Sequence, residues 1–460
     1  MFKIKKAISL MVVIAVVVSM MGMTGCAEKV TSSTDQTTTS TSNSTVQDKA
    51  STEKVDLRFA LSFAAADPQN KAAEVLLEQF KKENPNVTIQ NESTSSSRYH
   101  DKLKTEIASD MLPDVFANWG GSEVRGAVSA GSFLDLTTLL NENPTFKNDF
   151  LPGALSGPDV TYEDLPGQWG MPFMSIVTGF FYNKAIFEQV GVTPPETIED
   201  LIVVAQKLKD SGTIPWVVGG KDGWRIEHIY SALMYKYNGA GIAKDLASRK
   251  VKYSDPQSVE VFKVIENLRD LGVFGPNPAS VDFAMEQNLF QNGKTGMDFL
   301  MNAYIENYMG AASPIAKDVG YFAFPYFKDK PQYKDEIMGG GSMCLSISAN
   351  VKGTNREQYA NKLIMKFSGK AGLSEFVKIN ALIPPVKLDN MEELTTNEVQ
   401  KQFTATFEKA TGNCLDITLY DQVSSMLTKT RSVCTGLLNK QLTAEQAGQE
   451  LDNEIETNKK

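Results

Sequence analysis

The chain has few of the residues that build metal centres and thiol chemistry. Its 460 residues include only four cysteines and two histidines, at Cys26, Cys344, Cys414, Cys434, His100 and His228. Neither set has the short spacing of a zinc site, so we expect no metal site, no cofactor and no thiol protease. Cys414 and Cys434 could form a disulfide or remain buried free thiols, and the sequence leaves both open.

Positive charge is scarcer than negative charge. The 46 lysines and arginines are outnumbered by 55 aspartates and glutamates, giving a net charge of −9 at pH 7. This balance argues against nucleic acid or an anionic membrane surface as the partner.

The N-terminus has the three parts of an export signal. A positive region with Lys3, Lys5 and Lys6 precedes an apolar run, Ala7 to Met21, that is too short for a comfortable membrane span. The run ends in "MTGC", which resembles the bacterial lipoprotein box. We expect residues 1–25 to be a signal peptide and Cys26 to carry a lipid. That lipid would be the protein's one attachment to the membrane. The alternative is an ordinary secretory signal that happens to be followed by a cysteine.

Residues 26–54 are dominated by serine and threonine and have almost no large apolar side chains. Such a segment cannot bury enough surface to offset its ordering entropy, so we expect a flexible tether. A glycosylated stalk would have the same mechanical consequence. About four hundred residues follow. A single hydrophobic core seldom supports a chain of this length, so two domains are expected.

The remainder alternates strand and helix patterns. Val55 to Leu61 reads as a strand, and the next segment carries Ala73, Leu76, Leu77 and Phe80 at helical spacing. A strand, a helix and a third strand ending at "PDVFANW" follow, and this β-α-β-α-β order predicts a parallel sheet covered by helices. A second block of the same type contains a helix with Thr197 as its expected N-cap and a strand, "TIPWVVGG", in which Trp216 is expected to be a core residue.

Six motifs in order resemble those of the solute-binding proteins of ABC importers, the extracellular family that takes oligosaccharides. They are "LPDVFAN", "GSFLDLT", "GFFYNKAIFEQVG" with the helix behind it, "GGKDGW", "FQNGKTGM" and "GGGSMCLSISANVKG". The resemblance implies an α/β, two-lobe periplasmic-binding-protein-like fold of type II, with a hinge and an interlobe cleft. It places lobe one at residues 55–164 and 313–369, and lobe two at residues 165–312 and 370–460.

Aromatic and acidic residues at strand ends suit a sugar, because rings stack on its C–H faces and charged groups bind its hydroxyls. In "GGKDGW" we expect Asp222 to accept hydroxyl hydrogen bonds and Trp224 to stack, with Trp119 as the equivalent aromatic in lobe one. A core role is the alternative for both tryptophans. Further candidate contacts, each also explicable as loop structure, are Ser62, Asp67, Asn302, Tyr304, Gly340, Gly341 and Ser342.

The function implied is that of a monomeric, non-enzymatic receptor that captures a carbohydrate and presents it to the permease subunits of an ABC importer. Neither glycine cluster, "GGKDGW" or "GGGSM", is a phosphate-binding loop, since in neither are the glycines followed by Lys-Ser/Thr at the fixed spacing that such a loop needs. Two alternatives remain: a secreted glycan-acting enzyme, using a pair such as Asp222 and Glu227, and a sensor or adhesion protein on the same fold.

Overall fold

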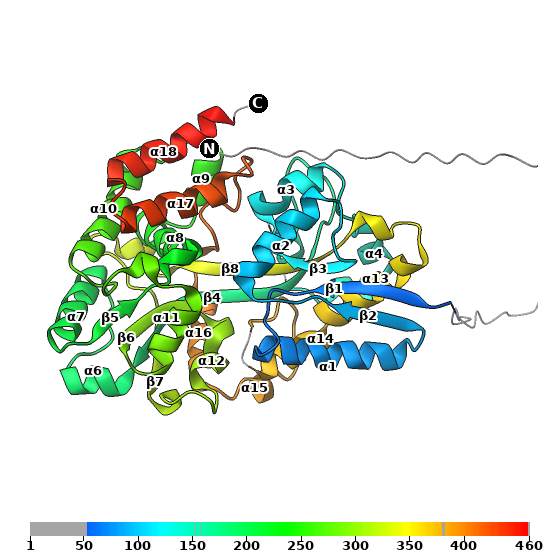
Figure 1. The fold of residues 1–460 in the computed structure, drawn as a ribbon, viewed down its shortest axis with the longest axis horizontal. Coiled ribbons are helices and arrows are strands. Elements are labelled where there is room, and N and C mark those ends of the chain that lie inside the picture. The colour runs from blue at the N-terminus through cyan, green and yellow to red at the C-terminus, as the bar shows by residue number, and fades with distance from the viewer. Residues whose placement is uncertain (1–52, 152, 158, 380–381, 459–460) are drawn as a thin grey trace, which may run out of the picture. The chain divides into compact units, whose positions relative to one another are not determined.

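A computed structural model describes residues 53–151, 153–157, 159–379 and 382–458 (Figure 1). The predicted signal peptide, the lipid site Cys26 and nearly all of the predicted tether lie outside the described residues. The described residues belong to one compact unit, Thr52–Lys460. None of its helices is long and apolar enough to cross a membrane.

The strands form a nine-stranded mixed sheet with the order β2-β1-β3-β8-β4-β6-β5, in which β7 also pairs with β4 and β9 with β8. Their bounds are β1 (Val55–Ala60), β2 (Val87–Asn91), β3 (Val115–Asn118), β4 (Met171–Asn183), β5 (Ile214–Val217), β6 (Thr295–Met301), β7 (Val319–Phe322), β8 (Glu336–Ile347) and β9 (Gly412–Cys414).

The helices cover both ends of this sheet. Their bounds are α1 (Pro68–Glu83), α2 (Ser96–Ala108), α3 (Gly121–Ser129), α4 (Thr137–Glu142), α5 (Pro144–Asn148), α6 (Lys184–Val190), α7 (Ile198–Asp210), α8 (Trp224–Asn238), α9 (Ile242–Ala247), α10 (Pro256–Asp270), α11 (Phe283–Gln291), α12 (Ile305–Met309), α13 (Asn355–Ser368), α14 (Lys370–Lys378), α15 (Met391–Leu394), α16 (Glu398–Lys409), α17 (Met426–Leu438) and α18 (Ala444–Thr457).

The predicted β-α-β-α-β opening is confirmed as β1 to β3. Strand β1 pairs in parallel with both β2 and β3, and α1 and α13 pack on these strands. In Figure 1, α2 and α3 lie on the opposite side of the strands from α1. The apolar positions predicted for α1, from Ala73 to Phe80, are buried.

Two long strands, β4 and β8, belong to both ends of the sheet. They pair with each other from Met171 to Val177 of β4. Beyond this, the last part of β4 pairs with β6 and β7, whereas the last part of β8 pairs with β3. Figure 1 shows both strands running between the β1–β3 region and the β5–β7 region. Nearly every residue of β4 is buried, and its sequence is mostly apolar, with Ser175 and Thr178 inside it, so it lacks the regular alternation of a half-exposed strand.

The lobe boundaries given above remain a prediction, and two contacts depart from them. Strand β7 lies in the predicted lobe-one segment 313–369 but pairs with the end of β4, next to β6. Helix α14 lies in the predicted lobe-two segment 370–460 but packs on α13 and α1. Pairing between distant strands decides these positions, and local sequence patterns do not report it.

The core around β5 and β6 is aromatic. Trp216 is fully buried, as expected, and its ring meets Phe180 at 4.7 Å and Phe274 at 5.1 Å between centroids. The helix before it begins as predicted, because the Thr197 hydroxyl accepts the backbone N–H of Asp200 at 3.1 Å.

Replacing Trp216 by alanine should lower the free energy of unfolding by about 3–5 kcal/mol, because it removes a large side chain from a closed aromatic core. Urea denaturation measures the change. Val203→Ala is the control: Val203 is 55% exposed on α7, and its loss should change stability by no more than about 0.5 kcal/mol. Similar effects for the two variants would contradict the buried position of Trp216.

Candidate ligand-binding cavity

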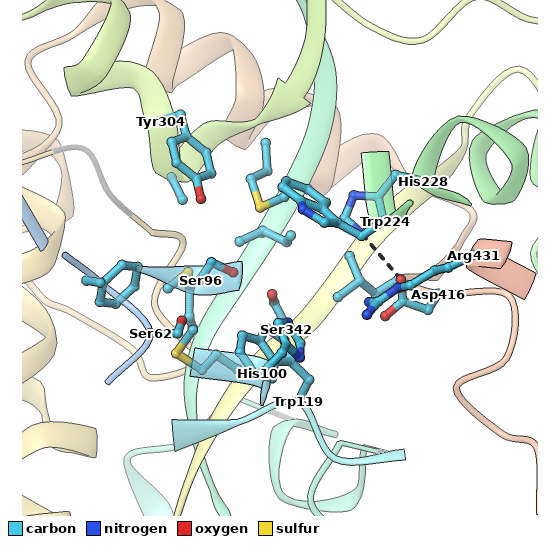
Figure 2. A pocket seen from close by; sticks show the side chains of 17 residues that line it. Ser62, Ser96, His100, Trp119, Trp224, His228, Tyr304, Ser342, Asp416 and Arg431 are labelled. Carbon is cyan, nitrogen blue, oxygen red and sulfur yellow. Dashed lines mark ion pairs between the residues drawn. The ribbon is translucent and has the colours of Figure 1, made fainter. Parts of the chain in front are cut away.

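Seventeen residues from widely separated segments line one cavity (Figure 2). They follow the ends of β1, β3 and β6, lie on β4 and β8, and come from the starts of α2 and α8, from α17 and from the segment before it. The residues are Ser62, Phe63, Ser96, His100, Trp119, Met174, Ile176, Trp224, His228, Met301, Ala303, Tyr304, Ser342, Met343, Leu415, Asp416 and Arg431. Strand ends of an open α/β sheet are where such proteins bind ligands.

Five of the ten predicted contact residues line this cavity: Ser62, Trp119, Trp224, Tyr304 and Ser342. Both predicted stacking residues are among them. Each tryptophan is half-buried, which leaves ring surface for a ligand. Their role as ligand contacts remains a prediction.

Three other predicted residues do not line the cavity, and their side chains accept hydrogen bonds from backbone N–H groups. The Asp222 carboxylate accepts the N–H of Phe283 at 2.6 Å, and the Asp67 carboxylate accepts the N–H of Ala64 at 2.7 Å. Asn302 is fully buried, and its side-chain oxygen accepts the N–H of Val177 at 3.0 Å. These hydrogen bonds fit a role in loop structure, which was the alternative noted for Asp67 and Asn302. The hydrogen bond of Asp222 fits the same role.

The last two, Gly340 and Gly341, line a second cavity of about 340 Å³ on the other side of β4. Successive residues of a strand point to opposite faces. Met174 and Ile176 therefore face the first cavity, whereas Ser175 faces the second. A Cβ at position 341 would lie 2.6 Å from a carboxylate oxygen of Asp159, so a larger residue there would require the Asp159 side chain to move.

Trp119 is held by its neighbours at the end of β3. The imidazole of His100 stacks on its indole at 3.9 Å between centroids and 13° between planes, and Nδ1 of His100 lies 2.7 Å from Oε1 of Glu123. The chain turns immediately after Trp119 because the Asn118 side chain accepts the N–H of Gly120 at 2.9 Å. Since His100 covers one face of the indole, a ligand can stack only on the opposite face.

The "GGKDGWR" stretch is organised by a buried ion pair. Arg225 and Glu286 are both fully buried, and the guanidinium meets the carboxylate at 2.7–3.0 Å. The same carboxylate accepts the N–H of Gly219 at 2.7 Å. Burial acts to lower the pKa of Arg225, but the charges of Glu286 and Asp298 outweigh it and raise that pKa. Trp224, between Gly223 and Arg225, is thereby fixed at the start of α8, with the guanidinium 4.8 Å from its ring centroid.

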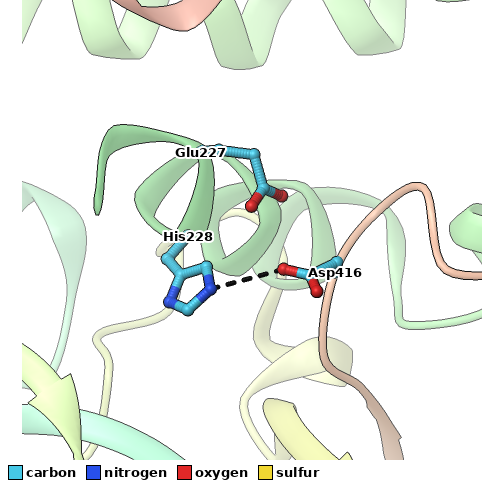
Figure 3. Close-up of side chains that lie close together, drawn as sticks. All are labelled: Glu227, His228 and Asp416. Carbon is cyan, nitrogen blue, oxygen red and sulfur yellow. Dashed lines mark ion pairs between the residues drawn. The ribbon is translucent and has the colours of Figure 1, made fainter. Parts of the chain in front are cut away.

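Glu227, His228 and Asp416 form a second polar cluster (Figure 3), and the last two of them line the cavity. Nε2 of His228 is 3.3 Å from Oδ1 of Asp416, and Oε1 of Glu227 accepts the Ser231 hydroxyl at 2.7 Å. Burial lowers the pKa of His228, although Asp416 opposes this. Burial also acts to raise the pKa of Asp416, but His228 and the charge of Arg431 outweigh it and lower that pKa to about 2.

Sequence reasoning missed His100, His228, Asp416 and Arg431 as cavity residues. Neither histidine was among the predicted contact residues, although both histidines of the chain line the cavity. The only sequence signal that could have indicated them is that the chain has just two histidines. The three described cysteines, Cys344, Cys414 and Cys434, are buried free thiols, which is one of the two alternatives left open for the last two.

Comparison with known proteins identifies the family. Residues 65–353, more than half of the chain, match the family described as "Bacterial extracellular solute-binding protein". The chain belongs to this family. The predicted resemblance is thus confirmed, and the cavity described above lies in an extracellular solute-binding protein.

Individual relatives are distant. The chain is 24% identical over 267 residues to an uncharacterised ABC transporter extracellular-binding protein of Pyrococcus horikoshii, covering 57% of this chain and 60% of the relative. It is 23% identical over 329 residues to a multiple sugar-binding protein of Streptococcus mutans, covering 66% and 70%. The chain therefore spans less than two thirds of the first relative's length.

A solved structure of a chitin oligosaccharide binding protein has a TM-score of 0.76 and 24% sequence identity, covering 86% of this chain and 98% of that one. At this identity the likeness bears on the fold. It confirms the predicted two-lobe α/β architecture of the solute-binding family.

Breaking the buried ion pair should destabilise the protein strongly. Arg225→Met leaves Glu286 buried without its partner and should cost about 3–5 kcal/mol of unfolding free energy, measured in urea. Arg225→Met combined with Glu286→Gln should recover part of that loss, because only one of the two buried carboxylates that faced the guanidinium, that of Asp298, then lacks its positive partner. The control is Lys263→Met, which removes an exposed i,i+3 pair with Glu260 and should cost less than about 1 kcal/mol. Equal costs for the two single variants would contradict the interpretation.

Asp159 in the second cavity should make stability depend on pH. Burial raises the pKa of its carboxyl to about 6, above its value in an unfolded chain. The folded state therefore holds the proton more tightly, and stability falls as pH rises from about 4 through 6.

Asp159→Asn removes this penalty. We expect the variant to be more stable than the unaltered protein at pH 7.5, by on the order of 2–3 kcal/mol, and to lose that advantage near pH 4. Melting temperatures across this range test the sign, with Glu163→Gln, a nearby exposed acid, as the control. An advantage that grows toward low pH would contradict the assignment.

Proposed function

We propose that this protein captures a carbohydrate, most simply an oligosaccharide, outside the cell and delivers it to an ABC importer. The observation that carries the proposal is that Trp119 and Trp224, from opposite ends of the sheet, line one cavity together with polar groups. Indole faces match the C–H patches of a sugar ring, and the polar groups match its hydroxyls.

Some polar atoms of the cavity wall have unused hydrogen-bonding capacity. Nδ1 of His228 and Nε of Arg431 are buried and have no hydrogen-bond partner among the described residues. A buried polar atom without a partner costs about 1–3 kcal/mol. A ligand hydroxyl that supplied the missing partner would recover that cost on binding.

The names of several relatives support carbohydrate as the ligand class. The Streptococcus mutans relative is a multiple sugar-binding protein, the Rhizobium meliloti relative is an alpha-glucosides-binding periplasmic protein, and the solved structure above is a chitin oligosaccharide binding protein. These names differ in the sugar, so the proposal for this chain is confined to carbohydrate.

The mechanism proposed is hinge closure without any chemical reaction. The cavity holds about 60 Å³, room for a few water molecules, so a sugar ring can enter only when the two ends of the sheet separate. β4 and β8 are the strands shared by both ends and are the natural place for that movement. Contacts from both tryptophans would then stabilise the closed state over the open one.

The cellular setting follows from the N-terminal sequence. Residues 1–25 would direct export, Cys26 would carry the lipid, and the serine- and threonine-rich residues 27–54 would tether a monomeric receptor at the outer face of the membrane, next to its permease. For the enzyme alternative, neither acid of the pair Asp222 and Glu227 is among the residues that line this cavity. The sensor or adhesion alternative differs from the receptor proposal only in its partner. Loss of sugar uptake on gene deletion would favour the receptor proposal over this alternative.

Titration of the protein from Thr52 onward against a panel of neutral oligosaccharides tests the proposal. Tryptophan emission should change in a saturable way for at least one sugar, and the sugar should be recovered uncleaved. Trp224→Ala should weaken that binding about tenfold or more, because it removes a stacking surface.

Trp169 provides the matched control. It is a partly buried tryptophan outside the cavity lining, and its indole N–H donates to the Leu165 carbonyl at 3.0 Å. Trp169→Phe should leave the affinity unchanged. Cleaved sugar would replace the receptor proposal by the enzyme alternative, and a panel without any binding would overturn the ligand class.

A further inference from the structure

We propose that Glu227, His228 and Asp416 form a zinc-binding site in the wall of the cavity. Each offers a side-chain ligand atom, and these atoms all lie within 4.8 Å of one another. It is the one such group of three among the described residues. One imidazole and two carboxylates are a ligand set that zinc uses in proteins.

One pair of ligand atoms already has the separation of two ligands on a zinc ion. Zinc binds histidine nitrogen and carboxylate oxygen at about 2.0–2.2 Å, so two ligands at a tetrahedral angle lie about 3.4 Å apart. Nε2 of His228 and Oδ1 of Asp416 are 3.3 Å apart, beyond the usual range for a hydrogen bond. Figure 3 shows the Glu227 carboxylate directed toward the same space.

Unpartnered atoms independently point to a cation. Oε2 of Glu227 and Oδ1 of Asp416 are buried and have no hydrogen-bond partner among the described residues. Glu227 is fully buried and Asp416 is 6% exposed. Two carboxylates this close in a buried place need a positive group between them to be ionised together. A divalent ion at this point would bind both unpartnered oxygens.

The surrounding hydrogen bonds orient the ligands. The Ser231 hydroxyl donates to Oε1 of Glu227 at 2.7 Å and accepts the N–H of Ile417 at 3.0 Å. One serine thus fixes the Glu227 carboxylate and the segment that carries Asp416. Metal ligands in proteins are typically supported in this way by outer hydrogen bonds.

The site leaves one position for a further ligand. His228 and Asp416 also line the cavity, so a zinc ion with three protein ligands would have its fourth position toward that space. With zinc on Nε2, the proton of His228 is on Nδ1, which has no protein partner. The positive charges of Arg431 in the same wall and of Arg225 oppose a cation at this point.

Calorimetric titration with zinc chloride, without sugar, tests the site. The full-length protein is purified without a histidine tag and treated with a chelator, and a Cys26→Ser variant identifies any binding at that thiol. We expect one zinc ion per chain, and cobalt at the same site should give visible absorption typical of a tetrahedral centre. His228→Gln and Asp416→Asn should each weaken zinc binding by about 100-fold or more.

The other histidine supplies the control. His100→Gln should leave zinc affinity and stoichiometry unchanged, and melting temperatures confirm that each variant is folded. The proposal is overturned if zinc does not bind, if His228→Gln binds it as tightly as the unaltered protein, or if His100→Gln abolishes binding. Because no sugar is present, a negative result leaves the receptor proposal untouched, and zinc binding would stand even if no sugar bound.

Discussion

The buried ion pair between Arg225 and Glu286 is the constraint on which the cavity depends. It joins the start of α8 to α11 and, through the N–H of Gly219, to the end of β5. Trp224, His228 and Glu227 all lie within three residues of Arg225 on α8. Breaking such a pair leaves a charge buried without compensation, so the position of the helix start that carries the cavity-lining Trp224 and His228 depends on this one interaction.

The second constraint is the pairing of β4 with β8. Because these strands belong to both ends of the sheet, they form the floor between two cavities, and alternate side chains of β4 face one or the other. Met174 and Ile176 give the first cavity an apolar floor. Gly339 to Gly341 allow the second cavity to approach the strand closely, with Asp159 against the backbone of Gly341. Movement at this pair of strands would alter both cavities together.

Much of the fold follows from local sequence patterns. The order of strands and helices at the start of the chain, the helix start at Thr197 and the buried position of Trp216 were all predicted, since each depends on periodicity or on a cap within a few residues. The candidate site was predicted in part. Trp119 and Trp224 were expected in the cavity because aromatic residues at strand ends meet at one edge of a sheet. The ligand role of Asp222 stays a prediction, and its carboxylate accepts a backbone N–H from the start of α11.

What the sequence by itself determined is the alternation of elements, the family motifs and the chemistry of individual strand ends. Only the tertiary structure decided that Asp416 and Arg431, about two hundred residues beyond "GGKDGW", share a wall with His228 and Trp224. It also decided that β7 joins β4 and that α14 returns to α13. The physical reason is that side-chain periodicity reports which face of an element is buried, whereas long-range contacts depend on which strands pair.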